Sequence, residues 1–73
     1  MARHEVESEV AGSVWKVEVV VGATVAKGDV LIILESMKME IPVESPVNGV
    51  VEEILVKPED QVAEEQVLVI VRS

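Results

Sequence analysis

Lys38 is the side chain of this sequence that is best suited to covalent chemistry. A lysine carries a primary amine on a flexible four-carbon stem, and the amine attacks an activated carboxyl group once the pocket of an enzyme has removed its proton. The product is a neutral amide, so acylation would remove one positive charge and change the formal net charge from −8 to −9. Lys38 is therefore a candidate acylation site.

Two methionines, Met37 and Met39, flank this lysine. The thioether side chain is flexible and polarisable, so it adapts to the surface of a binding partner. We expect Met37 and Met39 to contact an enzyme that modifies Lys38. The alternative is that they fold back and cover the body of the domain.

Other groups that perform catalysis or bind metals are scarce. The chain has no cysteine, which removes disulfides, thiol chemistry and cysteine-type zinc sites. The single histidine, His4, cannot form a metal site or a catalytic triad alone, and the glutamates lack the spacing of a calcium-binding loop. We predict no catalytic residue and no metal site, and we expect that the chain is not an enzyme.

Composition restricts the kinds of partner. Six Lys and Arg against fourteen Asp and Glu give a net charge of −8, and aromatic residues make up 1 % of the chain. This charge excludes the basic surface of a typical nucleic-acid reader and disfavours anionic membranes. Apolar runs such as Val30–Leu34 are far shorter than the ~18 residues of a membrane span, and residues 1–10 lack the apolar core of an export signal. We expect a cytoplasmic monomer whose acidic side chains form a solvated face or steer it towards basic partners.

The 73 residues suffice for one domain, and they contain an internal repeat. Residues 6–35 align without a gap on residues 43–72, which lie 37 positions later, and 12 of the 30 aligned pairs are identical. Chance would give about three to four identities. The sequence therefore predicts a single domain, residues 1–73, made of two copies of one unit joined by a hairpin at residues 36–42.

Each copy of the repeat has the pattern of short strands. Apolar and acidic residues alternate around Val6 and Val17, turn residues interrupt the chain at short intervals, and Pro58 suits the second position of a type I turn. We predict about eight strands in an all-β flattened barrel or sandwich with a pseudo-twofold axis, because one open sheet would leave an apolar face uncovered. The predicted core comprises repeated apolar residues: Val10, Val14, Val19, Val25, Val30, Leu31, Ile33 and their partners Val47, Val51, Val56, Val62, Val67, Leu68 and Ile70.

The segment between the two copies places Lys38 at a turn. Predicted strands at Val30–Glu35 and Met39–Glu44 flank it, so the centre of the repeat is the tip of a β-hairpin. Hairpin tips usually contain Gly, Asn or Asp, and a lysine between methionines departs from that preference. The only aromatic residue, Trp15, aligns with Glu52 and is expected to point outward, where it covers one end of the barrel or serves in docking.

The segment Glu35–Glu40, with Pro46 and Gly49 downstream, resembles the biotin carboxyl carrier family. In that family a Met-Lys-Met hairpin bears the biotinylated lysine, and a segment containing Pro and Gly follows. The stretch Val25–Leu31 is similar to the turn that precedes this hairpin, and the resemblance extends over residues 5–72. It implies a flattened barrel of two four-stranded antiparallel sheets.

The resemblance also implies a function. Lys38 would carry covalent biotin attached by a biotin protein ligase, and the ligase would recognise Met37 and Met39. The biotin would receive a carboxyl group at a biotin carboxylase site and deliver it at a carboxyltransferase site, while the carrier itself makes no bond. The chain most resembles a stand-alone biotin/lipoyl attachment protein without the protruding thumb of some acetyl-CoA carboxylase carriers.

Two alternatives remain open. Ser36 stands where the biotin motif usually has Ala, and Glu-Ser before the lysine is closer to the related lipoyl domains. A lipoyl ligase would then attach lipoate to Lys38 for acyl or aminomethyl transfer, although Met37 and Met39 favour biotin. From a different class, the chain would be an unmodified β-barrel interaction module.

Overall fold

The computed structural model describes residues 2–73, and within them all regular structure is β-strand. The strands are β1 (Arg3–Glu7), β2 (Gly12–Val17), β3 (Thr24–Val25), β4 (Val30–Ser36), β5 (Met39–Glu44), β6 (Gly49–Ile54), β7 (Gln61–Val62) and β8 (Val67–Arg72). The predicted all-β class is confirmed. Nothing in residues 2–73 forms a helix long and apolar enough to cross a membrane.

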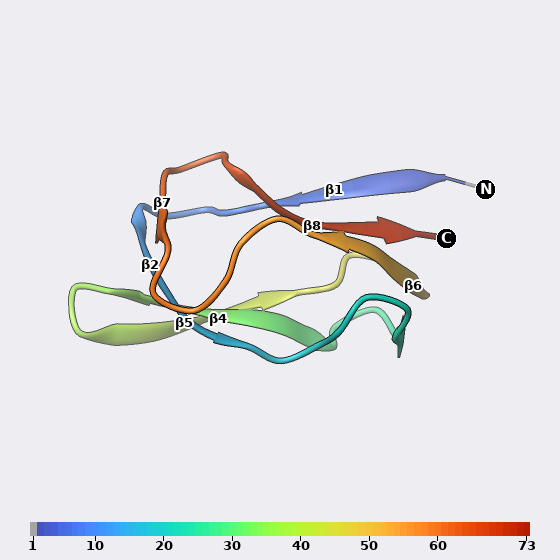
Figure 1. Cartoon of the computed structure of the whole chain (residues 1–73), viewed down its shortest axis with the longest axis horizontal. Coiled ribbons are helices and arrows are strands. Elements are labelled where there is room, and N and C mark those ends of the chain that lie inside the picture. Colours follow the sequence, from blue (N-terminus) through green and yellow to red (C-terminus); the bar gives the residue numbers. More distant parts are fainter. Residues whose placement is uncertain (1) are drawn as a thin grey trace.

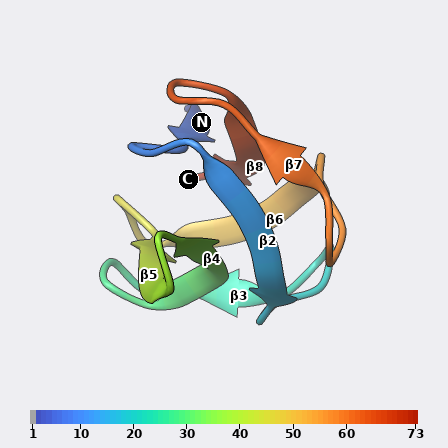
Figure 2. The same ribbon diagram turned by 90° about the vertical axis from the view of Figure 1, so that its left-hand side faces the viewer.

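The strands form two antiparallel sheets that pack face to face (Figure 1; Figure 2). One sheet has the strand order β1-β8-β6-β3, and the other has the order β5-β4-β2-β7. The sheets do not close into a complete barrel, since β1 and β5 are both edge strands. The predicted flattened barrel-sandwich of two four-stranded sheets is confirmed.

The two sheets are equivalent under the sequence repeat. A shift of 37 residues carries β2 onto β6 and β3 onto β7 with identical bounds, and it carries β1 onto β5 and β4 onto β8 to within a residue or two. Replacing each strand of one sheet by its counterpart gives the strand order of the other sheet. This relationship is the pseudo-twofold symmetry that the sequence predicts.

Tight turns also recur between the halves. The turns at residues 20–23 and 57–60 are each closed by a backbone hydrogen bond of 3.1 Å from the fourth residue to the first. Their third residues, Gly22 and Glu59, have φ angles of 94° and 76°. A positive φ at the third position alone defines a type II turn, so the turn at Pro58 is type II and the predicted type I is wrong.

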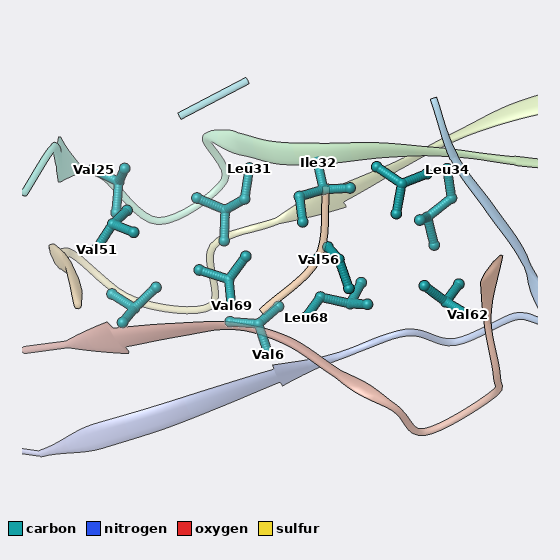
Figure 3. Packing of buried hydrophobic residues seen from close by; sticks show 12 residues of the cluster. Val6, Val25, Leu31, Ile32, Leu34, Val51, Val56, Val62, Leu68 and Val69 are labelled. Carbon is teal, nitrogen blue, oxygen red and sulfur yellow. The ribbon is translucent and has the colours of Figure 1, made fainter. Parts of the chain in front are cut away.

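The core lies between the sheets, and its largest side chains are Leu31, Ile32, Leu34 and Leu68 (Figure 3). Most of the predicted core residues are buried or pack against this cluster, but Val30, Ile33 and Val67 do neither, and all three are half-buried. For Ile33 the reason is a β-bulge at Leu31, where β4 has one residue more than β5. The bulge interrupts the alternation, so Leu31 and Ile32 are both buried and Ile33 is turned away from the core.

The domain is elongated, with dimensions of 36 × 18 × 18 Å. The β4–β5 hairpin lies at one end of the long axis, and both chain termini lie at the other (Figure 1). At the terminal end, Ala2 and Ser73 exchange two backbone hydrogen bonds of 3.1 and 2.9 Å. The linker between the two repeats therefore lies at one end, or pole, of the long axis of the molecule.

Candidate functional site

The chain reverses at Lys38 in the shortest common hairpin loop. Ser36 pairs with Met39 as the last pair of the β4–β5 ladder, so only Met37 and Lys38 form the turn. Both have positive φ, 50° at Met37 and 65° at Lys38, which defines a type I′ turn. The structure thus places Lys38 at the tip, as the repeat predicts.

Neither residue of this turn is of a type that the conformation favours. Type I′ turns prefer Asn-Gly, because positive φ brings the Cβ atom of other residues too close to the following carbonyl oxygen. The penalty is about 1 kcal/mol for each residue. Stability therefore does not explain why Met37 and Lys38 occupy the turn, and strain of this kind is typical of functional positions.

The tip side chains are open to solvent. Met37 is 92 % exposed and Met39 is 63 % exposed, so neither methionine folds back into the core. Lys38 is exposed too, and no hydrogen bond or ion pair to another of residues 2–73 holds its side chain. Its amine is free to enter the pocket of another protein.

The base of the hairpin is held firmly to β2. Ser36 donates a hydrogen bond of 2.9 Å from its Oγ to the carbonyl oxygen of Ala11. Gly12 lies so close to β4 that an added Cβ would clash with the carbonyl oxygen of Glu35. A side chain at position 12 would push the hairpin away from the body, so Gly12 helps to fix the position of Lys38.

Two carboxylates flank the tip. Glu35 and Glu40 are directly paired across β4 and β5, and both are exposed. They are the next pair after Ser36 and Met39, which close the turn. Like charges in such a pair disfavour the hairpin slightly. They also add negative charge to the hairpin that bears the amine, which favours approach to a positively charged surface.

The other residues that the sequence singles out do not join this site. His4 lies on β1 near the opposite pole, where its Nε2 is 2.9 Å from the Oγ of Ser73. Trp15 is the extra residue of a bulge in β2, which turns its ring outward and leaves it 45 % exposed, as its alignment with Glu52 predicts. Within residues 2–73, no group of three acidic or histidine side chains is placed to hold a metal ion.

One surface feature was not expected from the sequence. A groove runs between the edge strands β1 and β5. Its acidic lining residues are Glu5, Glu7, Glu9, Glu44, Glu64 and Glu65. The groove arises because the sheets stay open at these edges, and residues related by the repeat, such as Glu7 and Glu44, line it.

Fold and site together define a class of small β-domains that present one lysine on a tight hairpin. The chain belongs to the biotin/lipoyl family, since the family model described as "Biotin-requiring enzyme" matches residues 3–71. The match includes the whole hairpin, the first repeat and all but the last residue of the second repeat.

Individual relatives agree with this membership. The chain is 46 % identical over 63 residues to a "Biotin/lipoyl attachment protein" of Bacillus subtilis, with 86 % of each chain covered. It is 48 % identical over 56 residues to the "Biotinylated protein TB7.3 homolog" of Mycobacterium leprae, with 77 % of this chain and 79 % of the relative covered.

A solved structure shows the same fold inside a much larger protein. The crystal structure of the Kluyveromyces lactis urea carboxylase matches 99 % of this chain with a TM-score of 0.93 and 33 % identity. The match covers 6 % of that protein, so the chain is similar to one small part of the carboxylase.

Proposed function

We propose that this chain is a carrier whose Lys38 is biotinylated, and that it moves carboxyl groups between a biotin carboxylase site and a carboxyltransferase site. The observation that carries the proposal is that Lys38 is exposed on a type I′ turn, with no side-chain partner among residues 2–73, in a chain of this family. The names of the Bacillus and Mycobacterium relatives, which refer to biotin attachment, support it.

The attachment step needs only the amine from this chain. The Nζ of Lys38 attacks the carbonyl carbon of biotinyl-AMP held by a biotin protein ligase. The new C–N bond forms, the bond from that carbon to the phosphate oxygen breaks, AMP leaves, and the ligase takes the proton from the nitrogen. The exposed apolar side chains of Met37 and Met39 are suited to contact the ligase around the reacting amine.

The rest of the domain supports the tip and does not react. When bound, biotin supplies the carboxyl-carrying chemistry, so this chain need only hold the biotin in position. The two-sheet body holds the hairpin through hydrogen bonds, whereas the four-carbon stem of Lys38 can rotate freely beyond it. Tethering in this way keeps the reactive ring at high effective concentration near both enzyme sites. A non-catalytic role in the cytoplasm, which the lack of cysteine favours, is part of this proposal.

A lipoyl carrier is the second candidate. The Bacillus relative is named for attachment of biotin or lipoate, and Glu35-Ser36 before the tip resembles the lipoyl motif. The same exposed amine would serve either acyl group. The distinction therefore depends on which ligase accepts the hairpin.

Intact-mass measurement tests the proposal. The protein is incubated with ATP and biotin protein ligase plus biotin, or with lipoyl ligase plus lipoate, and then probed with streptavidin. We expect the mass of one biotinyl group and a streptavidin signal in the first reaction, both lost in Lys38→Arg and both kept in the control Lys27→Arg. Addition of lipoate alone would favour the second candidate, and no added mass in either reaction would contradict the carrier function.

A further inference from the structure

The sulfur atoms of residues 2–73 all lie beside Lys38. The chain has no cysteine, and two of its three methionines are Met37 and Met39; the third, Met1, lies outside the described residues. Met37 is 92 % exposed, more than any other exposed large hydrophobic residue in the described part of the chain, and Met39 is 63 % exposed. Within residues 2–73, the groups that a peroxide oxidises most readily therefore directly precede and follow the acceptor lysine in the chain.

Oxidation at these two positions would leave the fold intact. Neither methionine belongs to the core cluster. The contacts that fix the hairpin are the β4–β5 backbone ladder and the hydrogen bond from Ser36 to Ala11, and neither involves a sulfur atom. Oxidation of a buried methionine disrupts packing, whereas here the change is confined to the exposed surface around Lys38.

We propose that Met37 and Met39 form a site of reversible oxidation by hydrogen peroxide or an organic hydroperoxide, and that their sulfoxides make Lys38 a poorer acceptor. The thioether sulfur attacks one peroxide oxygen, an S–O bond forms and the O–O bond breaks. The proton on the oxygen that is transferred to sulfur moves to the second peroxide oxygen, which leaves as water or an alcohol. The sulfur is oxidised by two electrons and the peroxide is reduced.

The effect on acylation rests on the proposed function. A ligase that acylates Lys38 must bring its own surface against the side chains next to it, and a thioether offers that surface apolar atoms. A sulfoxide is polar and chiral, so the same contact would require removal of water from the S–O group. Loss of one well-buried apolar contact corresponds to about a tenfold fall in kcat/KM.

The first experiment locates the oxidation. Unmodified protein is treated with limiting hydrogen peroxide and digested with trypsin, which cleaves after Lys38 and so puts Met37 and Met39 on different peptides. We expect one added oxygen at Met37 first and at Met39 next, with an unchanged circular dichroism spectrum and urea midpoint. Oxidation of Trp15 ahead of both methionines, or loss of the folded spectrum, would overturn the assignment.

The second experiment measures the consequence. Oxidised and untreated samples are compared as substrates of biotin protein ligase, and we expect kcat/KM to fall about tenfold on oxidation and to recover after treatment with methionine sulfoxide reductases. The double variant Met37→Leu/Met39→Leu, and each single variant, are compared before and after peroxide. Leucine keeps an apolar side chain but accepts no oxygen, so the double variant should not respond.

The outcomes separate this inference from the proposed function. Equal rates for oxidised and untreated wild-type protein would overturn the inference and leave the carrier function standing. An equal fall in the double leucine variant would also overturn it, because the damage would then lie elsewhere. Absence of acylation in the untreated protein would contradict the carrier function itself.

Discussion

Gly12 lies against β4 where a Cβ atom would clash with the carbonyl oxygen of Glu35. A Cβ atom on Gly49 would likewise clash with the carbonyl oxygen of Arg72. Gly49 and Arg72 lie 37 positions after Gly12 and Glu35, so the two contacts are equivalent under the repeat. The first close approach supports the base of the Lys38 hairpin, whereas the second involves Arg72, the neighbour of the C-terminal Ser73. The symmetry thus provides a matched pair of sites, of which one adjoins the acceptor lysine.

Substitution of these glycines should separate stability from acceptor function. We expect Gly12→Ala and Gly49→Ala each to lower the free energy of unfolding by about 2 kcal/mol, because the added methyl group forces the strands apart. Gly12→Ala should in addition slow acylation of Lys38, since it displaces the hairpin. Urea unfolding and ligase kinetics on both variants check this, and equal acylation rates in the two variants would contradict the positioning role of Gly12.

Two glutamates occupy backbone positions that suit glycine. Glu59 and Glu65 have φ angles of 76° and 71°, and the first repeat has Gly22 and Gly28 at the equivalent positions. Replacing such a glutamate by glycine relieves the strain of a positive φ, which stabilises the folded state by about 1 kcal/mol. Part of this gain is offset because glycine has greater conformational freedom in the unfolded chain. We expect Glu59→Gly and Glu65→Gly each to stabilise the protein by about 0.5 kcal/mol in urea unfolding. The reciprocal change Gly22→Glu should destabilise it, and stabilisation there would contradict the strain argument.

Substitutions in the turn at the tip should raise the stability of the fold and abolish attachment of biotin. The double variant Met37→Asn/Lys38→Gly has the residues that a type I′ turn prefers, so we expect it to unfold at higher urea concentration, by about 1 kcal/mol. It should accept no biotin, because the amine is gone. The single variant Lys38→Gly measures how much of this gain in stability comes from replacing the lysine. A double variant less stable than the wild type would show that Met37 and Lys38 are not strained.

The sequence predicted the site better than it predicted the core. The position of Lys38 followed from the repeat, because a duplicated unit must be joined at its centre and the joint between two antiparallel strands is a turn. Full burial of Ile32 and only partial burial of Ile33 did not follow, because the run Val30–Leu34 is apolar at every position and does not reveal the bulge at Leu31. The groove was missed since it depends on which strands stay unpaired, and only the three-dimensional pairing of edges decides that.

A surface ion-pair cluster should contribute little to stability. Glu52 accepts hydrogen bonds from both Arg3 and Arg72, and the arginine side chains are about half exposed. Water and salt screen such pairs, so we expect Glu52→Gln to cost less than about 1 kcal/mol, with the loss shrinking at high salt. Urea midpoints at low and high salt measure this. Glu18→Gln is the control, since Glu18 forms no ion pair with another of residues 2–73.

Site-resolved mass spectrometry after reaction with biotin protein ligase tests the carrier function most directly. The chain has four lysines, Lys16, Lys27, Lys38 and Lys57, and fragmentation of the peptides that contain them assigns the added mass to one lysine. We predict one biotinyl group per chain, all of it on Lys38, with the other three lysines unmodified. A biotinyl group on any other lysine, or none on Lys38 after complete reaction, would contradict the account.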